Sequence, residues 1–145
     1  MNLKETESAF NRFSKQVQKK TRFRITKGDH KASGRLRKET SFSVKVNKNS
    51  IEQTYTRPFY SDFQDQGVSG KKTKYNTPFS YKNKRPPAKV FEKWAKQKAI
   101  KPRDKKTGRF ISFKAFGFMV ARKIFIHGIE PKQFFTKTFK QEFKN

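Results

Sequence analysis

The sequence contains no cysteine, which removes disulfide bonds, thiolate zinc sites and cysteine nucleophiles together. His30 and His127 are its only histidines, so a metal site or a histidine-based catalytic triad has little to be built from. The longest apolar run, near residues 116–121, is about six residues long and too short to span a membrane. The N-terminal segment carries two glutamates and no apolar core, so we expect no secretory signal.

Acidic residues are scarce too, at 11 Asp+Glu against 37 Lys+Arg, which gives a formal net charge of +26 over 145 residues. Asp62 and Asp65 lie close together in the sequence, and we interpret them as an exposed, solvated pair on one helical face. A nuclease is disfavoured because no carboxylate cluster is present to hold metal ions. We therefore expect no enzymatic activity, no cofactor and no metal.

Lysine and phenylalanine are abundant instead. There are 27 Lys, 10 Arg, 17 Phe and only two Leu, while apolar residues make up 32% of the chain. Flexible lysines suit the neutralisation of phosphates better than the recognition of base edges. The positive charge therefore favours a polyanionic partner. Among such partners, a nucleic acid is favoured over a membrane. Many phenylalanines fall at helical spacing, which favours core and subunit contacts over stacking on unpaired bases.

The N-terminal part, residues 1–57, is predicted to form a helix followed by a hairpin. Apolar residues fall on one stripe over residues 3–20, which predicts an amphipathic helix with Asn2 as its cap. Apolar and polar residues then alternate in residues 22–26 and 41–46. We interpret these two segments as paired strands, joined by a loop at residues 28–34.

The rest of the chain, residues 58–145, is predicted to be aromatic-rich and helical. We expect a short helix from Pro58, an extended loop or arm with at most one short strand over 68–86, and a helix after Pro86–Pro87. Ser112 is a candidate cap for a helix over 113–127 that ends at Gly128. That helix is so apolar that we expect it to be buried on most sides. A last helix is favoured for the segment with Phe134, Phe135, Phe139 and Phe143.

Together these elements predict a single α+β domain over residues 1–145. It consists of a small antiparallel hairpin packed with three to four helices, plus long ordered loops or arms. Two sets of candidate functional residues follow. The residues expected to face DNA or an acidic partner are Lys71, Lys72, Lys74, Lys101, Arg103, Lys105, Lys106 and Arg109. The exposed aromatic residues expected at subunit contacts are Phe10, Phe13, Trp94, Phe134, Phe135 and Phe139.

A resemblance to a known family begins near Tyr60. Residues 60–70 read YSDFQDQGVSG, and residues 78–82 read PFSYK. The Pro86–Pro87 pair, the Trp94 helix and GRFIS at 108–112 follow, and then ARKIFIHGIEP at 121–131 leads into FFTKTF at 134–139. In this order the segments resemble small neck or tail-completion proteins of tailed bacteriophages, especially virion proteins of crAss-like podophages. There an aromatic helix ends at a D-x-G-V turn, and an A-R-x-I-x-x-x-G-I-x-P-x-x-F-F segment closes the domain.

The resemblance covers about 85 of the 145 residues. It implies an α+β virion subunit, made in the host bacterial cytoplasm, that assembles into a homo-oligomeric ring, twelve-fold in that family. Such a ring lies between portal and tail, contacts other neck and tail rings, and surrounds the DNA channel. Its contact with genomic DNA would be non-specific. The alternative from composition alone is a small basic RNA-binding protein of ribosomal type.

Overall fold

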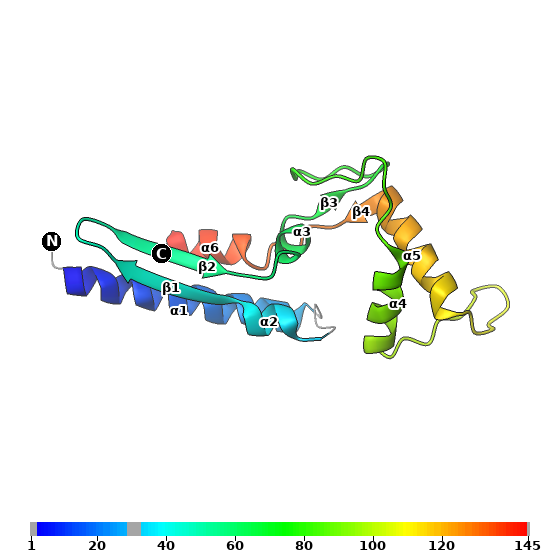
Figure 1. Ribbon diagram of the computed structural model, residues 1–145, viewed down its shortest axis with the longest axis horizontal. Coiled ribbons are helices and arrows are strands. Elements are labelled where there is room, and N and C mark those ends of the chain that lie inside the picture. The colour runs from blue at the N-terminus through cyan, green and yellow to red at the C-terminus, as the bar shows by residue number, and fades with distance from the viewer. Residues whose placement is uncertain (1–2, 29–32, 145) are drawn as a thin grey trace. The chain divides into compact units, whose positions relative to one another are not determined.

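The computed structural model describes residues 3–28 and 33–144 and has an α+β fold, as the sequence predicts. Six helices and two small antiparallel sheets of two strands each lie in the described ranges (Figure 1). In chain order the elements are α1 (Leu3–Lys27), α2 (Arg35–Glu39), β1 (Ser41–Val46), β2 (Ile51–Thr56), α3 (Ser61–Asp65), β3 (Val68–Ser69), α4 (Ala88–Gln97), α5 (Phe113–His127), β4 (Gly128–Ile129) and α6 (Thr136–Phe143).

The chain divides into two compact units, where we expected one domain from the sequence. Unit 1 consists of Met1–Asp65 together with Gln133–Asn145, and unit 2 is Gln66–Lys132. Unit 1 therefore contains α1, α2, the β1–β2 hairpin, α3 and α6, and unit 2 contains α4, α5 and the β3–β4 pair. None of the helices in the described ranges is both long enough and apolar enough to cross a membrane.

Helix α1 extends to Lys27, so the predicted strand over residues 22–26 is wrong. The buried face of the helix explains the difference, because Val17, Thr21 and Ile25 follow one another at intervals of four and are all buried. Residues 22–26, in which apolar and polar residues alternate, form the last turns of the helix that carries this buried stripe. Two further expectations, the Asn2 cap and the middle of the loop at 28–34, lie outside the described residues.

The hairpin pairs β1 with β2, so the predicted pairing of 41–46 with residues 22–26 is also wrong. Its register runs from Ser41 opposite Thr56 to Val46 opposite Ile51. The half-buried face of the hairpin includes Val44, Gln53 and Tyr55. The hairpin contacts α1, and the side-chain amide of Gln53 donates a hydrogen bond to the Ser14 hydroxyl of that helix.

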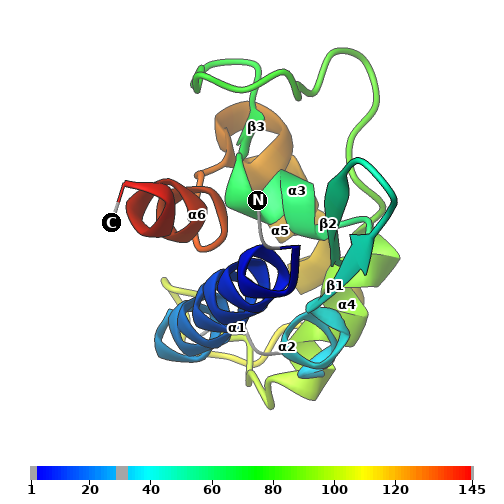
Figure 2. The same ribbon diagram turned by 90° about the vertical axis from the view of Figure 1, so that its left-hand side faces the viewer.

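Helix α6 lies beside α1 in unit 1 (Figure 2). Aromatic ring contacts join α6 to α1 and to β2. The Phe139 ring lies edge-on to Phe13 at 5.7 Å and to Tyr55 at 5.8 Å, measured between ring centroids. The Lys20 ammonium group of α1 also lies 2.6 Å from the buried Glu142 carboxylate of α6. The core itself is small: its buried apolar cluster is Ile25, Leu36 and Phe134.

In unit 2, helices α4 and α5 pack closely because Gly117 has no side chain. A Cβ atom at this position would lie 2.6 Å from the carbonyl oxygen of Ala88. The bounds of α5 agree with the sequence prediction, and the Ser112 hydroxyl caps it by accepting a hydrogen bond from the Ala115 amide. Gly128 ends α5 at φ 77° and pairs with Ser69 in the β3–β4 ladder.

Candidate nucleic-acid interface

Unit 2 carries most of the excess positive charge. It has 19 Lys and Arg residues against three Asp and Glu residues, a net charge of +16 over 67 residues. The carboxylates of Asp104 and Glu130 already have partners within the unit: Asp104 accepts hydrogen bonds from its own turn, and Glu130 lies 3.4 Å from the Lys132 ammonium group. The cations of unit 2 therefore exceed anything that its own carboxylates can neutralise.

Residues 101–110, the basic loop, form an ordered turn built around Asp104. Its carboxylate accepts hydrogen bonds from the Thr107 amide at 2.8 Å, the Lys106 amide at 2.9 Å and the Thr107 hydroxyl at 3.1 Å. These three donors hold the pKa of Asp104 below its ordinary value, the Thr107 amide contributing most. Gly108 supplies the left-handed conformation of the turn, with φ 67°. The loop thus presents its cations from a defined backbone.

The five predicted cations of the basic loop are all exposed, namely Lys101, Arg103, Lys105, Lys106 and Arg109. None of them forms an ion pair with a carboxylate in the described part of the chain. The Arg103 guanidinium carbon lies 4.1 Å from the ring centroid of Phe110, which is 62% exposed. The loop is therefore a positive surface that is open to a polyanion.

The predicted cations at 71–74 form a second, separate cluster at the other end of α5. Lys71, Lys72 and Lys74 are exposed. The amides of Lys71 and Lys72 donate to the carbonyl oxygens of Phe125 and Ile126, in the last turn of α5. The basic loop precedes the first turn of this 15-residue helix, which is about 22 Å long. The structure therefore does not bring the two predicted sets of cations into one site.

The aromatic residues predicted at subunit contacts differ in exposure. Phe10 and Trp94 are exposed, and Phe13, Phe135 and Phe139 are half-buried. Phe134 is only 1% exposed and belongs to the core of unit 1, so the prediction that it is an exposed aromatic residue is wrong. The short loop between β4 and α6 places it against Ile25 and Leu36.

An apolar groove on unit 1 gathers several of these rings. It has a volume of about 270 Å³. Its lining residues come from α1, β2 and α6: Ala9, Phe10, Phe13, Gln53, Phe139, Glu142 and Phe143. The sequence predicts Phe143 as part of the last helix, but Phe143 was not among the residues predicted at subunit contacts; it is 76% exposed. Its spacing of four residues from Phe139 is the signal that places it beside the same groove.

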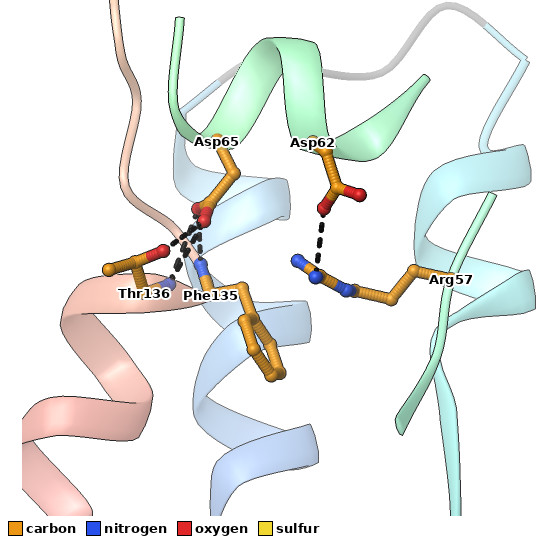
Figure 3. A network of polar contacts seen from close by, with 5 residues as sticks. All are labelled: Arg57, Asp62, Asp65, Phe135 and Thr136. Carbon is orange, nitrogen blue, oxygen red and sulfur yellow. Dashed lines mark hydrogen bonds and ion pairs between the residues drawn. The ribbon is translucent and has the colours of Figure 1, made fainter. Parts of the chain in front are cut away.

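The prediction that Asp62 and Asp65 form an exposed, solvated pair is wrong, because Asp65 is 1% exposed. Its carboxylate accepts hydrogen bonds from the amides of Phe135 at 2.8 Å and Thr136 at 3.1 Å, and from the Thr136 hydroxyl (Figure 3). Asp62 instead pairs with Arg57 at 2.9 Å. Both carboxylates thus form contacts within the fold, and Asp65 holds the start of α6 in place.

The exposed face of α5 was not predicted from the sequence. We expected this helix to be buried on most sides, and that prediction is wrong. Phe118 is 50% exposed and Met119 is 57% exposed. The high apolar content of the helix concealed which of its faces lies against α4. Arg122 and Lys123, on the same exposed face, add two cations that the sequence analysis did not select.

The described residues include no group of three or more His, Cys, Asp or Glu side chains that could hold a metal ion. No protein-family model, curated protein sequence or solved structure matches the chain.

Proposed function

We propose that this chain is a structural virion protein that forms an oligomeric ring in the neck of a tailed bacteriophage. The ring lies between portal and tail and surrounds the DNA channel. The observation that carries the proposal is the basic loop, an ordered turn with five exposed cations and no carboxylate partner among the described residues. Such a surface meets phosphates without reading base sequence, which is what a channel lining requires.

Features of unit 1 support assembly with neighbouring subunits. Its buried apolar cluster is small, and aromatic side chains such as Phe10 and Phe143 remain exposed around an apolar groove. In the described ranges each strand of the β1–β2 hairpin has one pairing partner, so each strand leaves a free edge. Exposed aromatic surface and open strand edges are both features by which subunits associate. The order of motifs from Tyr60 onward, which resembles phage neck proteins, agrees with this proposal.

Light scattering tests the proposal on nuclease-treated protein in about 0.5 M salt, where phosphate contacts are weak. We expect a discrete closed oligomer, or assembly onto a purified portal ring. A partly unfolded monomer that becomes ordered only with added RNA would overturn the proposal in favour of an RNA-binding protein of ribosomal type. A folded monomer that neither self-associates nor binds a portal ring would overturn it as well.

A further inference from the structure

Helix α5 has one face that packs against α4 and another whose side chains are exposed. Gly117 and Ala121 are buried on the packed side. The exposed side repeats every four residues, as the faces of a helix do. We call it the α5 face, and it consists of Lys114, Ala115, Phe118, Met119, Arg122 and Lys123.

The α5 face has an apolar centre with cations at both ends. Phe118 and Met119 lie in the middle, 50% and 57% exposed. Lys114 precedes them by one turn and Arg122 follows by one turn, and neither forms an ion pair with a carboxylate of the described chain. The Arg85 guanidinium carbon also lies 4.9 Å from the Phe118 ring centroid. A complementary surface must therefore combine apolar side chains with flanking negative charge.

A nucleic acid meets only half of that requirement. The outer surface of a DNA duplex presents phosphates, which would pair with Arg122 and Lys114 but leave Phe118 and Met119 without an apolar partner. Single-stranded bases can stack on aromatic rings, but Arg85 already lies over the Phe118 ring. A protein surface can satisfy the apolar centre and the cations together. Methionine suits such contacts because its flexible side chain adapts to irregular surfaces.

We propose that the α5 face binds an acidic amphipathic helix of a partner protein. An exposed helix face packs well against a second helix, whose side chains enter the grooves of the first. Ala115 is the smallest side chain of the α5 face and lies one turn before Met119. The identification of the partner as part of an adjoining neck ring rests on the proposed function, whereas the chemistry of the face does not.

The test uses the full-length protein and a fluorescent synthetic helix of about 20 residues, with leucines along one face and glutamates on both sides of them. Anisotropy is measured near physiological salt for the wild type and for the double variant Phe118→Ser/Met119→Ser, both positions being exposed. A scrambled peptide of the same composition controls for simple charge attraction. The matched control variant, Lys105→Ala/Lys106→Ala, removes two cations from the basic loop instead.

We expect the amphipathic peptide to bind at least tenfold more tightly than the scrambled one. The Phe118→Ser/Met119→Ser variant should lose roughly tenfold in affinity, as for central apolar contacts, and the loop variant should lose about twofold or less. Equal binding of the two peptides, or no loss in the apolar variant, would overturn the inference. So would a tenfold loss of binding to single-stranded DNA or to phosphatidylserine vesicles in that variant, since it would assign the face to nucleic acid or membrane. None of these results depends on whether the protein forms a ring.

Discussion

At the scale of single residues, Asp65 joins two segments of unit 1 that are far apart in the sequence. The end of α3 and the start of α6 are held together by the hydrogen bonds that its carboxylate accepts from Phe135 and Thr136 (Figure 3). Because the carboxylate is buried, nothing replaces it when it is removed, and the two amides lose their acceptor. Unit 1 thus depends on one acidic residue in a chain with few of them.

We predict that Asp65→Ala lowers the free energy of unfolding of unit 1 by about 3 kcal/mol, because the amides of Phe135 and Thr136 and the Thr136 hydroxyl lose a buried acceptor. Urea denaturation followed by circular dichroism measures the change. The control is Asp62→Ala, which breaks a partly exposed pair with Arg57 and should cost about 1 kcal/mol or less. Equal losses in the two variants would contradict the role assigned to Asp65.

The turn of the basic loop has a pH dependence of its own. Hydrogen bonds from Thr107 and Lys106 place the pKa of Asp104 below the unfolded value of about 3.9. The stabilisation of the turn is therefore present above that value and is lost as the pH falls through the folded-state pKa. We predict that an NMR titration finds the pKa of the Asp104 carboxyl group below that of an unfolded peptide, and that the Lys106 and Thr107 amides lose protection, relative to their intrinsic exchange rates, at the acidic end. A pKa at or above that of a model peptide would contradict the turn geometry.

At the scale of elements, the contact between α4 and α5 depends on Gly117. A side chain there would meet backbone of α4, since the Cβ position lies 2.6 Å from the Ala88 oxygen. We predict that Gly117→Ala destabilises unit 2 by about 2 kcal/mol, despite the better helix propensity of alanine. Fluorescence of Trp94, the only tryptophan and part of α4, measures thermal unfolding of this unit.

The matched control for Gly117→Ala is Ala115→Ser, on the exposed side of the same helix. It should change stability by about 0.5 kcal/mol or less. A Gly117→Ala variant as stable as the wild type would show that the two helices separate without cost, contrary to the 2.6 Å between the Gly117 Cβ position and the Ala88 oxygen.

How well each element could be predicted from the sequence depends on how much of its signal is local. Ser112 and Gly128 are end signals within the helix's own sequence, and they predict α5 with the bounds that the structure has. Strand β2 was not predicted, because its half-buried face includes the polar Gln53, whose partner Ser14 lies 39 residues away in the chain. The extent of α1 was also misjudged, because the sequence does not reveal what its buried stripe contacts.

The parts of the candidate site also differ in whether a local sequence signal predicts them. The basic loop could be predicted, since a lysine-rich turn with Gly108 at its tip is readable in one stretch of sequence. The α5 face could not, because which side of an apolar helix is covered depends on α4 and on the approach allowed by Gly117. The separation of the Lys71–Lys74 segment from the basic loop likewise depends on where each segment meets α5.

At the scale of the whole molecule, the charge is unevenly divided between the units. Unit 2 carries +16 of the net +26, although it contains fewer than half of the residues. Unit 1 holds most of the acidic residues, and two of its carboxylates, those of Asp65 and Glu142, are buried in structural contacts. Contact with a polyanion should therefore be dominated by unit 2, and by its basic loop in particular.

This division predicts how DNA binding responds to salt. Duplex DNA should bind with little sequence preference, and affinity should fall steeply with salt as counterions are released. Lys105→Ala/Lys106→Ala should reduce the slope of log affinity against log salt by about 1.8, since each lost phosphate contact contributes about 0.9. The control, Lys15→Ala/Lys19→Ala, removes the same charge from exposed positions of α1 in unit 1 and should change the slope by less than about 0.5. Fluorescence anisotropy with two unrelated duplexes over a salt series measures both. Equal slopes for the two variants would mean that DNA responds only to total charge, and that the ordered basic loop has no specific part in binding.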